Sequence, residues 1–222
     1  MLNLDDFAEL TGTSRATVLR VAQKLGLSGY RQLQQHVLPL SEQDHVRQDP
    51  LISWLTQTSQ SVVEGTISML DLPQIEQIAR ELAKVKMIIW YGIGESGFLA
   101  EIANHKCWLL GINSTACKES SNFEGFSHNI NDSQAVILIS RTGNGHHIEK
   151  PLTIGREKGI YTVGISSGYS SFLAQNASVC LFAPTSDAMI KNQRISIRIG
   201  HELIINSLIL KIAQALQIPF VF

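Results

Sequence analysis

The sequence predicts two domains: a small all-α domain at the N-terminus and an α/β domain built on a five-stranded, doubly wound parallel sheet. The first prediction follows from the helical spacing of the apolar residues in residues 1–38. The second follows from residues 51–222, where apolar β-type runs alternate with amphipathic segments. Strands that are apolar throughout and are separated by helices are typical of a parallel sheet covered on both faces. Residues 39–50, polar and with two prolines, are the expected linker.

The N-terminal residues are expected to form two helices joined by a tight turn. Asn3 can cap the first helix and Ser14 the second, because both side chains accept hydrogen bonds from free helix N–H groups. Ala8, Gly12 and Val18 have the spacing of a helix-turn-helix: a small residue where the helices touch, a glycine in the turn and an aliphatic anchor in the second helix. We therefore predict a helix-turn-helix domain.

The second helix is expected to have an apolar face and a basic face. Gly26 provides its left-handed stop. The apolar face follows the spacing i, i+3, i+4, i+7 and consists of Val18, Val21, Ala22 and Leu25. From Gly12 to Leu38 there are four Lys or Arg and no acid, which is the charge that a phosphate backbone attracts. The alternative is a helical hairpin with a solvated basic face.

If the domain binds double-stranded DNA, the first turn of the second helix should meet base edges in the major groove. The residues expected to specify bases are Thr13, Ser14, Arg15 and Thr17. Those expected to hold phosphates are Arg20, Lys24 and Arg31.

The α/β domain is expected to begin with helices at about 51–70 and 74–84. The predicted strands are residues 87–94, 113–117, 135–140, 161–166 and 178–183. The predicted later helices are residues 96–110, 122–129, 146–158, 169–175 and 194–216. In such a domain a ligand binds in the crevice at the carboxyl ends of the strands.

The last helix is too apolar for a helix with one solvent-facing side. Residues 202–213 read ELIINSLILKIA. We interpret this as a buried contact between two copies of the chain, and expect this helix and the helix at 51–70 to form the contact of a homodimer.

Composition limits the remaining classes. The chain is 44% hydrophobic and 17% charged, enough to bury a core, and its net charge of -1 gives no overall nucleic-acid signal. No apolar run reaches the length of a membrane span and the first ten residues are acidic, so we expect a cytoplasmic protein with no membrane contact. Three widely spaced cysteines predict free buried thiols.

Hydroxyl and glycine residues follow three of the predicted strands. The first strand ends in YGIGESG (91–97), the third in SRTGNG (140–145) and the fourth in ISSG (165–168). Ser140 and Thr142 offer hydroxyl donors, and glycines let backbone amides approach an anion at a helix start. These residue types are also ordinary turn formers. Their joint occurrence at the strand ends predicts a phosphate site.

Neither a cofactor nor a metal ion is expected. Gly92, Gly94 and Gly97 have the spacing of a dinucleotide fingerprint, but Glu95 would place a negative charge in the pyrophosphate seat, and the nearest acid after the second strand, Glu119, lies in a loop. The neighbouring His146 and His147 would point about 100° apart on a helix and so do not form a metal pair. HEL at 201–203 lacks the second histidine of a zinc protease helix, because Ile205 stands there.

A helix-turn-helix followed by a sheet whose strands end in GIGESG, SRTGNG and GISS resembles the RpiR family of bacterial transcription regulators, whose second domain is a sugar isomerase (SIS) domain that binds phosphosugars. The resemblance covers nearly the whole chain. In that family the loop after the third strand usually reads Ser-x-Ser-Gly-x-Thr and holds the phosphate. The matching residues here are Ser140, Thr142, Gly143 and Gly145, so a hydroxyl is kept at Thr142 and lost at Gly145.

The resemblance and the strand ends together give the expected sugar phosphate site. Glu95 stands where relatives usually have a small residue, and Glu119 and Ser121 stand where many have Asp and His. Arg194 and Arg198, at the start of the last helix, could reach a ligand or a subunit interface. The expected ligand residues are Gly94, Glu95, Ser96, Glu119, Ser140, Thr142, Gly143, Asn144, Gly145, Ser166, Ser167 and Arg198.

The resemblance implies a DNA-binding transcription regulator rather than an enzyme, with no catalytic residues. We expect a repressor of a sugar or amino-sugar catabolic operon, controlled by a sugar phosphate such as an amino-sugar 6-phosphate. The alternative is a phosphosugar isomerase, which needs a general base; the residues able to serve are Glu95, Glu119, His146 and His147. A third reading is a phosphosugar-binding domain whose helical cap only dimerises.

Overall fold

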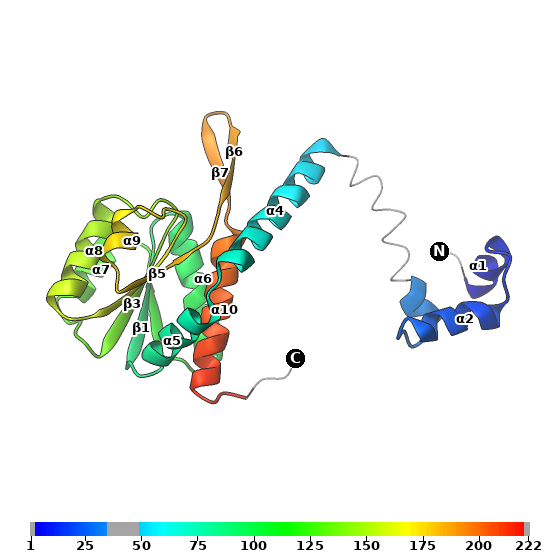
Figure 1. Ribbon diagram of the computed structural model, residues 1–222, viewed down its shortest axis with the longest axis horizontal. Coiled ribbons are helices and arrows are strands. Elements are labelled where there is room, and N and C mark those ends of the chain that lie inside the picture. Colours follow the sequence, from blue (N-terminus) through cyan, green and yellow to red (C-terminus); the bar gives the residue numbers. More distant parts are fainter. Residues whose placement is uncertain (1–2, 35–48, 220–222) are drawn as a thin grey trace. The chain divides into compact units, whose positions relative to one another are not determined.

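The computed structural model describes residues 3–34 and 49–219 (Figure 1). These fall into two compact units, of which the first ends at Gln57 and the second begins at Thr58. The boundary lies inside one helix, α4 (Pro50–Met69). Most of the predicted linker, residues 39–48, lies outside the described residues.

The first unit begins with the two predicted helices, α1 (Leu4–Leu10) and α2 (Arg15–Lys24). Asn3 caps α1 in a capping box, with its side chain accepting hydrogen bonds from the amides of the first turn. Ser14 caps α2 by accepting from Thr17 N–H at 3.2 Å. Both predicted caps are confirmed, and the left-handed glycines are where they were expected, with φ of +62° at Gly12 and +74° at Gly26.

The buried face of α2 differs from the predicted one. Val18 and Ala22 are buried, but Val21 and Leu25 are 46% and 60% exposed, so half of the predicted stripe was wrong. Residues 30–34 are helical and bring Leu33 against Ala22. Because this further helix packs on the side of α2 that carries Ala22, the buried face of α2 is centred there, and Val21 and Leu25 lie outside it.

The second unit contains the predicted five-stranded parallel sheet in the order β2-β1-β3-β4-β5 (Figure 1). The strands are β1 (Met87–Tyr91), β2 (Ser114–Cys117), β3 (Gln134–Ser140), β4 (Tyr161–Ser166) and β5 (Val179–Phe182). The chain runs from β1 to one edge and then from β3 to the other. Loops leaving β1 and β3 therefore diverge, and in folds of this kind a ligand crevice lies where the order reverses.

Alternate residues of each strand pack on opposite faces of this sheet. On β1, Ile88 and Trp90 belong to one core and Ile89 and Tyr91 to the other. The first core is covered by α5 (Leu72–Leu82), α6 (Glu95–Leu109) and α10 (Ile199–Ala215). The second is covered by α7 (Ser120–Ser127), α8 (His146–Glu157) and α9 (Phe172–Asn176). Both faces are buried, as the apolar strands predict.

The segment before the last helix contains a hairpin that the sequence analysis missed. β6 (Ser186–Ile190) and β7 (Gln193–Ile197) pair antiparallel, with Lys191 and Asn192 in the turn at φ of +46° and +63°. The prediction that the last helix begins at about residue 194 was therefore wrong. Positive φ at both central residues is typical of two-residue hairpin turns, and the alternation of polar and apolar residues along 193–197 favours a strand.

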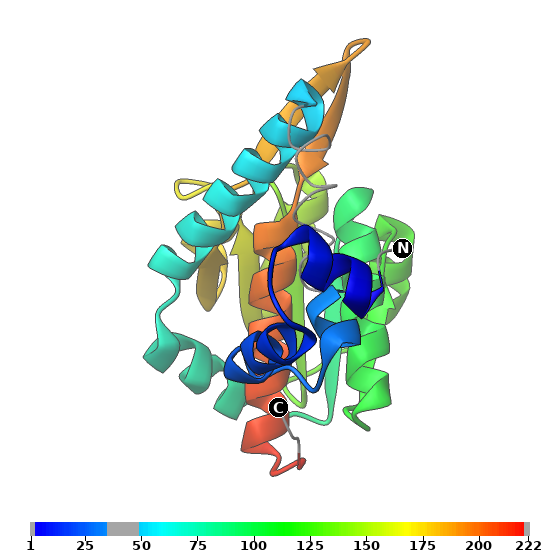
Figure 2. The same ribbon diagram turned by 90° about the vertical axis from the view of Figure 1, so that its right-hand side faces the viewer.

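The apolar surface of α10 is largely covered within the chain. Figure 2 shows α10 between α5 and α6 along one face of the sheet. Its residues Ile204, Ile205, Leu208, Ile209 and Ile212 are buried in the core of that face. Intrachain packing thus accounts for the apolar character that we attributed to a dimer contact. No helix within residues 3–34 and 49–219 is long and apolar enough to cross a membrane.

The three cysteines are free, as predicted. Cys107 and Cys117 are fully buried and Cys180 is partly buried. Burial raises the pKa of the Cys117 thiol to about 11 and that of Cys180 to about 12, so neither is a nucleophilic thiolate at neutral pH.

Candidate functional site

Two helices start beside the crevice at the carboxyl ends of the strands. α6 begins at Glu95, directly after Gly94 at φ +61°, and α8 begins at His146, directly after Gly145 at φ +108°. Glycine has no side chain that could accept hydrogen bonds from the first turn of a helix. The first N–H groups of both helices are therefore available to an anion.

The loop after β3 is a tight structure built around Gly143. Its N–H donates to Ser140 Oγ at 3.0 Å, and its carbonyl accepts from Leu173 N–H at 2.9 Å. Gly143 has φ of +68°, and a Cβ atom placed on it would lie 2.2 Å from Ser171 Oγ. Only glycine fits this position, because both the backbone conformation and the neighbouring serine exclude a side chain.

The hydroxyls predicted to bind phosphate differ in their accessibility. Ser140 and Ser166 pair in register at the ends of β3 and β4. Ser140 is 5% exposed and Ser166 is fully buried, with Ser166 Oγ accepting from Gly168 N–H at 3.1 Å. Thr142, by contrast, is exposed. Ser140 and Ser166 thus hold the loops in shape, while Thr142 is open to solvent.

Asn144 fixes the far side of the same loop. Its Nδ2 donates to Thr142 O at 3.2 Å, and its Oδ1 accepts from Phe172 N–H at 2.9 Å at the start of α9. Asn144 therefore joins the loop to the neighbouring helix and fixes the backbone amides next to it.

The start of α8 is tied to β1 through an internal proline. Pro151 has no N–H for the carbonyl of His147, four residues earlier. Tyr91 Oη donates to that carbonyl at 2.8 Å and replaces the missing hydrogen bond. This contact joins the end of β1 to the first turn of α8.

The side chain of Arg198 reaches from the start of α10 to the first turn of α6. Its side chain is only 10% exposed; Nη1 donates to Ser96 Oγ at 3.0 Å and lies 4.0 Å from Glu95 Oε2. Nε and Nη2 are buried and have no hydrogen-bond partner among the described residues. Burial lowers the pKa of Arg198, and the nearby Glu95 opposes this. The guanidinium remains charged and two of its nitrogens lack acceptors among the described residues, as expected for a group that binds an anion.

His201 lies one turn further along α10 and is fully buried. Neither ring nitrogen has a hydrogen-bond partner among the described residues. Burial, and then the positive charge of Arg198, lower the pKa of His201 to about 3, against the opposing influence of the Ser140 backbone. At neutral pH the buried imidazole is therefore uncharged, and both Arg198 and the Ser140 backbone influence it.

We expect His201 to make the domain sensitive to acid. Because its pKa falls from 6.5 to about 3 on folding, the folded chain binds fewer protons than the unfolded chain below pH 6.5. The free energy of unfolding should be unaffected above pH 6.5 and should fall below it by up to about 1.4 kcal/mol per pH unit. The free energy of unfolding can be measured with urea at pH 7.5 and 5.5. Its decrease between the two pH values should be about 1.4 kcal/mol smaller in His201→Gln than in the wild type. The exposed His105 is the control, and an equal effect of His105→Gln would contradict the assignment.

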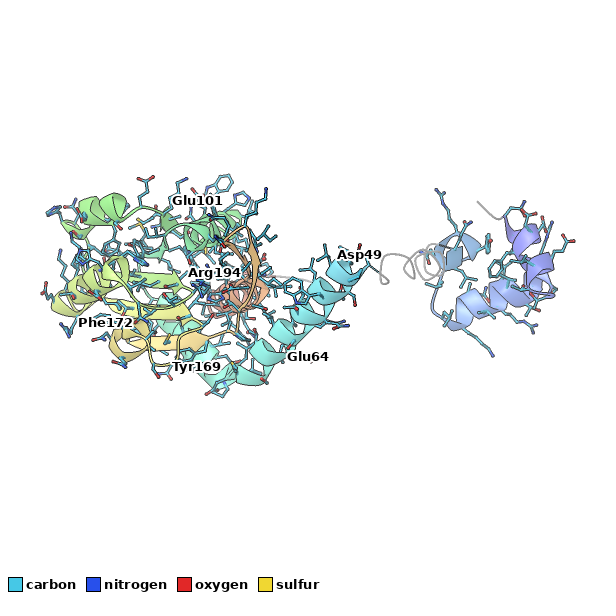
Figure 3. The ribbon with its side chains drawn as sticks, turned by 90° about the horizontal axis from the view of Figure 1, so that it is seen from above. Asp49, Glu64, Glu101, Tyr169, Phe172 and Arg194 are labelled. Atoms are coloured by element: carbon cyan, nitrogen blue, oxygen red, sulfur yellow. The ribbon has the colours of Figure 1, made fainter. Side chains whose placement is uncertain are left out.

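The hairpin β6–β7 adds charged groups to this end of the sheet. Asp187 Oδ2 lies 3.2 Å from Arg194 Nε and 3.6 Å from Arg141 Nη1. Arg194, labelled in Figure 3, belongs to β7, and Arg198 directly precedes α10. The prediction that both lie at the start of the last helix was therefore wrong for Arg194, and Arg198 is the residue just before that helix. One carboxylate is thus shared by two guanidinium groups.

The remaining predicted residues lie at the rim. Glu119 precedes α7 and is exposed, and Ser167 Oγ donates to Thr185 Oγ1 at 3.3 Å. His146 is exposed at the first position of α8, and His147 is half-buried. The Ser121 side chain lies outside the described residues.

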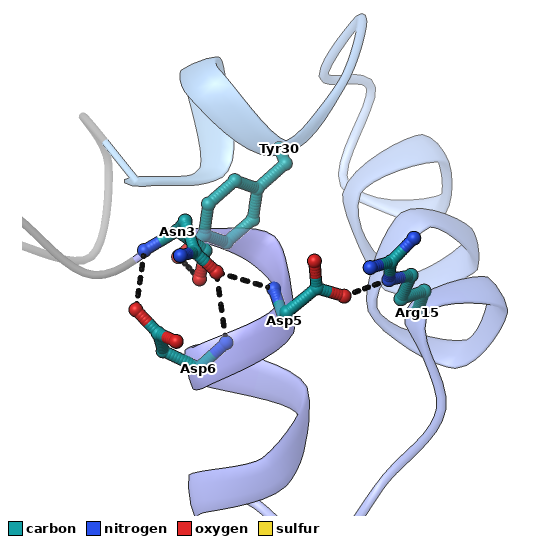
Figure 4. Close-up of polar contacts among 5 residues, drawn as sticks. All are labelled: Asn3, Asp5, Asp6, Arg15 and Tyr30. Atoms are coloured by element: carbon teal, nitrogen blue, oxygen red, sulfur yellow. Dashed lines mark hydrogen bonds and ion pairs between the residues drawn. The ribbon is translucent and has the colours of Figure 1, made fainter.

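The start of α2 presents the predicted base-reading residues. Ser14 Oγ lies 2.9 Å from Thr17 Oγ1, and Thr13 Oγ1 lies 3.0 Å from Thr11 Oγ1. Figure 4 shows Arg15 bonded through Nε to Asp5 of α1. The three residues predicted to hold phosphates are all exposed: Arg20, Lys24 and Arg31.

Three residues of these sites escaped the sequence analysis. Ser171 packs against Gly143 and caps α9, and a serine directly before a short helix was its signal. Asp187 was hidden because the hairpin was missed. For His201 we find no signal, since its burial depends on the packing of α10 against the sheet.

Comparisons with known proteins agree with this arrangement. Residues 81–204 match the SIS domain family. The uncharacterized HTH-type transcriptional regulator YbbH of Bacillus subtilis is 25% identical over 221 residues, covering 95% of this chain and 78% of the relative. The sugar isomerase domain of an RpiR transcription factor from Sphaerobacter thermophilus matches with a TM-score of 0.66 at 20% identity, covering 77% of this chain and 96% of that one. NanR of Vibrio vulnificus, solved with ManNAc-6P, matches with a TM-score of 0.66 at 15% identity, covering 96% and 79%.

Proposed function

The chain belongs to the SIS domain family, and we propose that it is a DNA-binding transcription regulator controlled by a sugar phosphate. Its similarity to the RpiR-type regulators supports this proposal. One observation carries the proposal: a buried, partly unpartnered guanidinium at Arg198 lies at the same end of the sheet as the uncapped start of α8. A phosphate is the ligand that suits both. Such a regulator acts in the cytoplasm, where the chromosome is.

The phosphate is proposed to lie at the start of α8. Thr142 Oγ1 and the backbone amides of Asn144, Gly145 and His146 are the donors, and Ser140, Ser166 and Ser167 keep the loops in position. The sugar then extends toward Gly94, Glu95 and Ser96, with Arg198 between the two parts and Glu119 at the rim. An amino-sugar 6-phosphate is the first class to screen, and the ligand of the NanR structure, ManNAc-6P, supports this choice.

We further propose that the ligand releases a homodimer from an operator, as a repressor of a catabolic operon requires. The ligand can do this only if it prefers one arrangement of the dimer over another. A coupling of about 1 to 3 kcal/mol would change operator affinity roughly 5- to 150-fold, and DNA would change ligand affinity by the same factor.

Two measurements test this function. A thermal-shift screen against a panel of sugar phosphates should identify the ligand, because a ligand at about 100 times its Kd adds roughly 2.7 kcal/mol to the folded state. Titration of that ligand against DNA binding at fixed salt should then weaken binding. Equal DNA affinity with and without saturating ligand would contradict the sensor mechanism.

Replacement of Thr142 by alanine should weaken binding of the best sugar phosphate by about 1.5 to 3 kcal/mol, because a hydrogen bond to a charged group is lost. Its exposure predicts little change in the unliganded fold. Ser140→Ala should weaken binding indirectly, because Gly143 N–H loses its acceptor and the loop loosens. Calorimetric titration measures the affinities, and wild-type affinity in both variants would place the phosphate elsewhere.

Replacement of Arg15 by alanine should weaken binding to preferred DNA by about 1 to 3 kcal/mol and relax the base preference. Lys24→Ala is the matched variant on the same helix. It should weaken binding to all sequences and lower the slope of affinity against salt by about one unit. Fluorescence anisotropy at several salt concentrations checks both, and equal changes in the two variants would contradict the division of roles.

A phosphosugar isomerase is the second candidate. Glu95 supports it, because its half-exposed carboxylate at the start of α6 could take a proton from a bound sugar. Incubation of the best ligand with the chain, followed by separation of sugar phosphate isomers, distinguishes the two functions. Turnover that is lost in Glu95→Gln would favour the enzyme.

A further inference from the structure

One basic residue of the proposed DNA-binding surface is held by a carboxylate of another helix. Arg15 is the first residue of α2, and its side chain is 65% exposed. Its Nε is bonded to Asp5 Oδ1 of α1 (Figure 4). Within residues 3–34 and 49–219, the structure gives Arg15 no other hydrogen-bond or ion-pair partner, and gives Arg20 and Lys24 no carboxylate partner.

Asp5 is itself fixed in place. Its N–H donates to Asn3 Oδ1 at 2.9 Å in the capping box of α1. The two helices are held together by the contact among Ala8, Val18 and Ala22. The backbone of Asp5 therefore occupies a defined position, from which its short side chain reaches Arg15.

We propose that Asp5 is a positioning residue that orients Arg15 for a guanine in the major groove; this inference rests on the proposed DNA-binding function. Because Asp5 accepts the hydrogen bond from Nε of Arg15, the two terminal nitrogens, Nη1 and Nη2, are left to donate to DNA. Two parallel donors of this kind match the O6 and N7 acceptors of guanine. Asp5 thereby restricts the number of orientations in which the guanidinium meets the DNA.

The expected effect is small in free energy but specific in kind. An exposed ion pair contributes about 0.2 to 1 kcal/mol, which corresponds to a preference of up to about 5-fold. Asp5→Asn also removes one negative charge that repels phosphates. Glu9→Gln, on the exposed surface of the same helix, removes the same charge without touching Arg15 and is the matched control.

The test uses the full chain and a pool of random-sequence DNA duplexes. Affinity for the whole pool is measured by anisotropy, and base preference by sequencing of the retained duplexes. Asp5→Asn should lower the enrichment of guanine at one position about 2- to 5-fold, whereas Glu9→Gln should leave it unchanged. Asp5→Glu, which keeps a carboxylate, should restore it. Far-UV circular dichroism checks that the helices of each variant are intact. Asp5→Ser, which also lacks the carboxylate, is measured in case Asp5→Asn does not fold.

A double substitution shows whether Asp5 acts through Arg15. In an Arg15→Ala background, Asp5→Asn should have no further effect on base preference. If the wild-type chain binds the duplexes and Asp5→Asn keeps the full preference for guanine, the inference about Asp5 is wrong and the DNA-binding function still stands. Failure of the wild-type chain to retain any duplex at low salt would overturn the DNA-binding function, and the inference with it.

Discussion

Replacement of Gly143 by alanine is expected to lower the free energy of unfolding of the α/β domain by about 2 to 5 kcal/mol and to abolish sugar phosphate binding. The left-handed backbone at φ +68° accounts for about 1 to 2 kcal/mol of this loss. The rest comes from the new Cβ atom, which would lie 2.2 Å from Ser171 Oγ and 2.6 Å from Ser171 Cβ. Ser171 cannot simply turn away, because its Oγ caps α9 and donates to Gly168 O.

Gly159 is the matched control for this prediction. Its φ of +65° is nearly that of Gly143, but a Cβ atom there would meet nothing within 4 Å. Gly159→Ala should therefore show the backbone cost alone, about 1 to 2 kcal/mol, and should leave ligand binding intact. Urea unfolding gives both stabilities and calorimetry gives both affinities. Equal losses of stability in the two variants would contradict the tight contact between Gly143 and Ser171.

The loop around Gly143 also shows what the sequence could predict. Strand ends, glycine positions and helix caps depend on local chemistry, and Asn3, Ser14 and Gly26 all have the predicted roles. Four of the five strands were predictable because they are largely apolar and are followed by turn residues; β2, which reads STAC, is short and half polar. Because parallel strands all end on one side of the sheet, the sequence also predicts on which side a ligand would bind.

Long-range packing set the limit of those predictions. Burial of Ser166 and exposure of Thr142 depend on how the loops after β3 and β4 meet, which no local pattern shows. Exposure of Val21 depends on the later helix that contributes Leu33. The hairpin at 186–197 was missed because its short alternation of polar and apolar residues was read as the start of a helix.

Arg198 shows the same limit within the site. The sequence analysis included it among the expected ligand residues, but its contact with Ser96 joins residues that are distant in the sequence. A buried guanidinium with two unpartnered nitrogens is costly to the empty domain, because each loses its hydrogen bonds to water. An anion in the crevice would supply the missing acceptors. If the proposed phosphate binds there, Arg198 lowers the stability of the domain without ligand and raises its affinity for the ligand.

Replacement of Arg198 by methionine is accordingly expected to change stability and affinity in opposite directions. Methionine fills much of the same volume without a charge, so the free energy of unfolding of the empty domain should rise by about 1 to 3 kcal/mol. Little is lost with the partner, because Glu95 is more than half exposed and remains hydrated. Binding of the best sugar phosphate should weaken by about 2 to 5 kcal/mol, as for truncation of one partner of a buried charge pair.

Arg194→Met tests whether the effect belongs to Arg198 or to charge alone. Arg194 lies on the neighbouring strand β7, is about half exposed and is paired with Asp187, so the same loss of one positive charge should change stability and affinity by less than about 1 kcal/mol. Thermal unfolding without ligand and calorimetric titration with it give the four comparisons. If Arg198→Met instead destabilises the empty domain, the bond to Ser96 outweighs the burial of the charge, and Arg198 is a structural residue. If both variants lose the same affinity, the crevice attracts anions through its overall charge, and the unpartnered nitrogens of Arg198 do not bind the ligand directly.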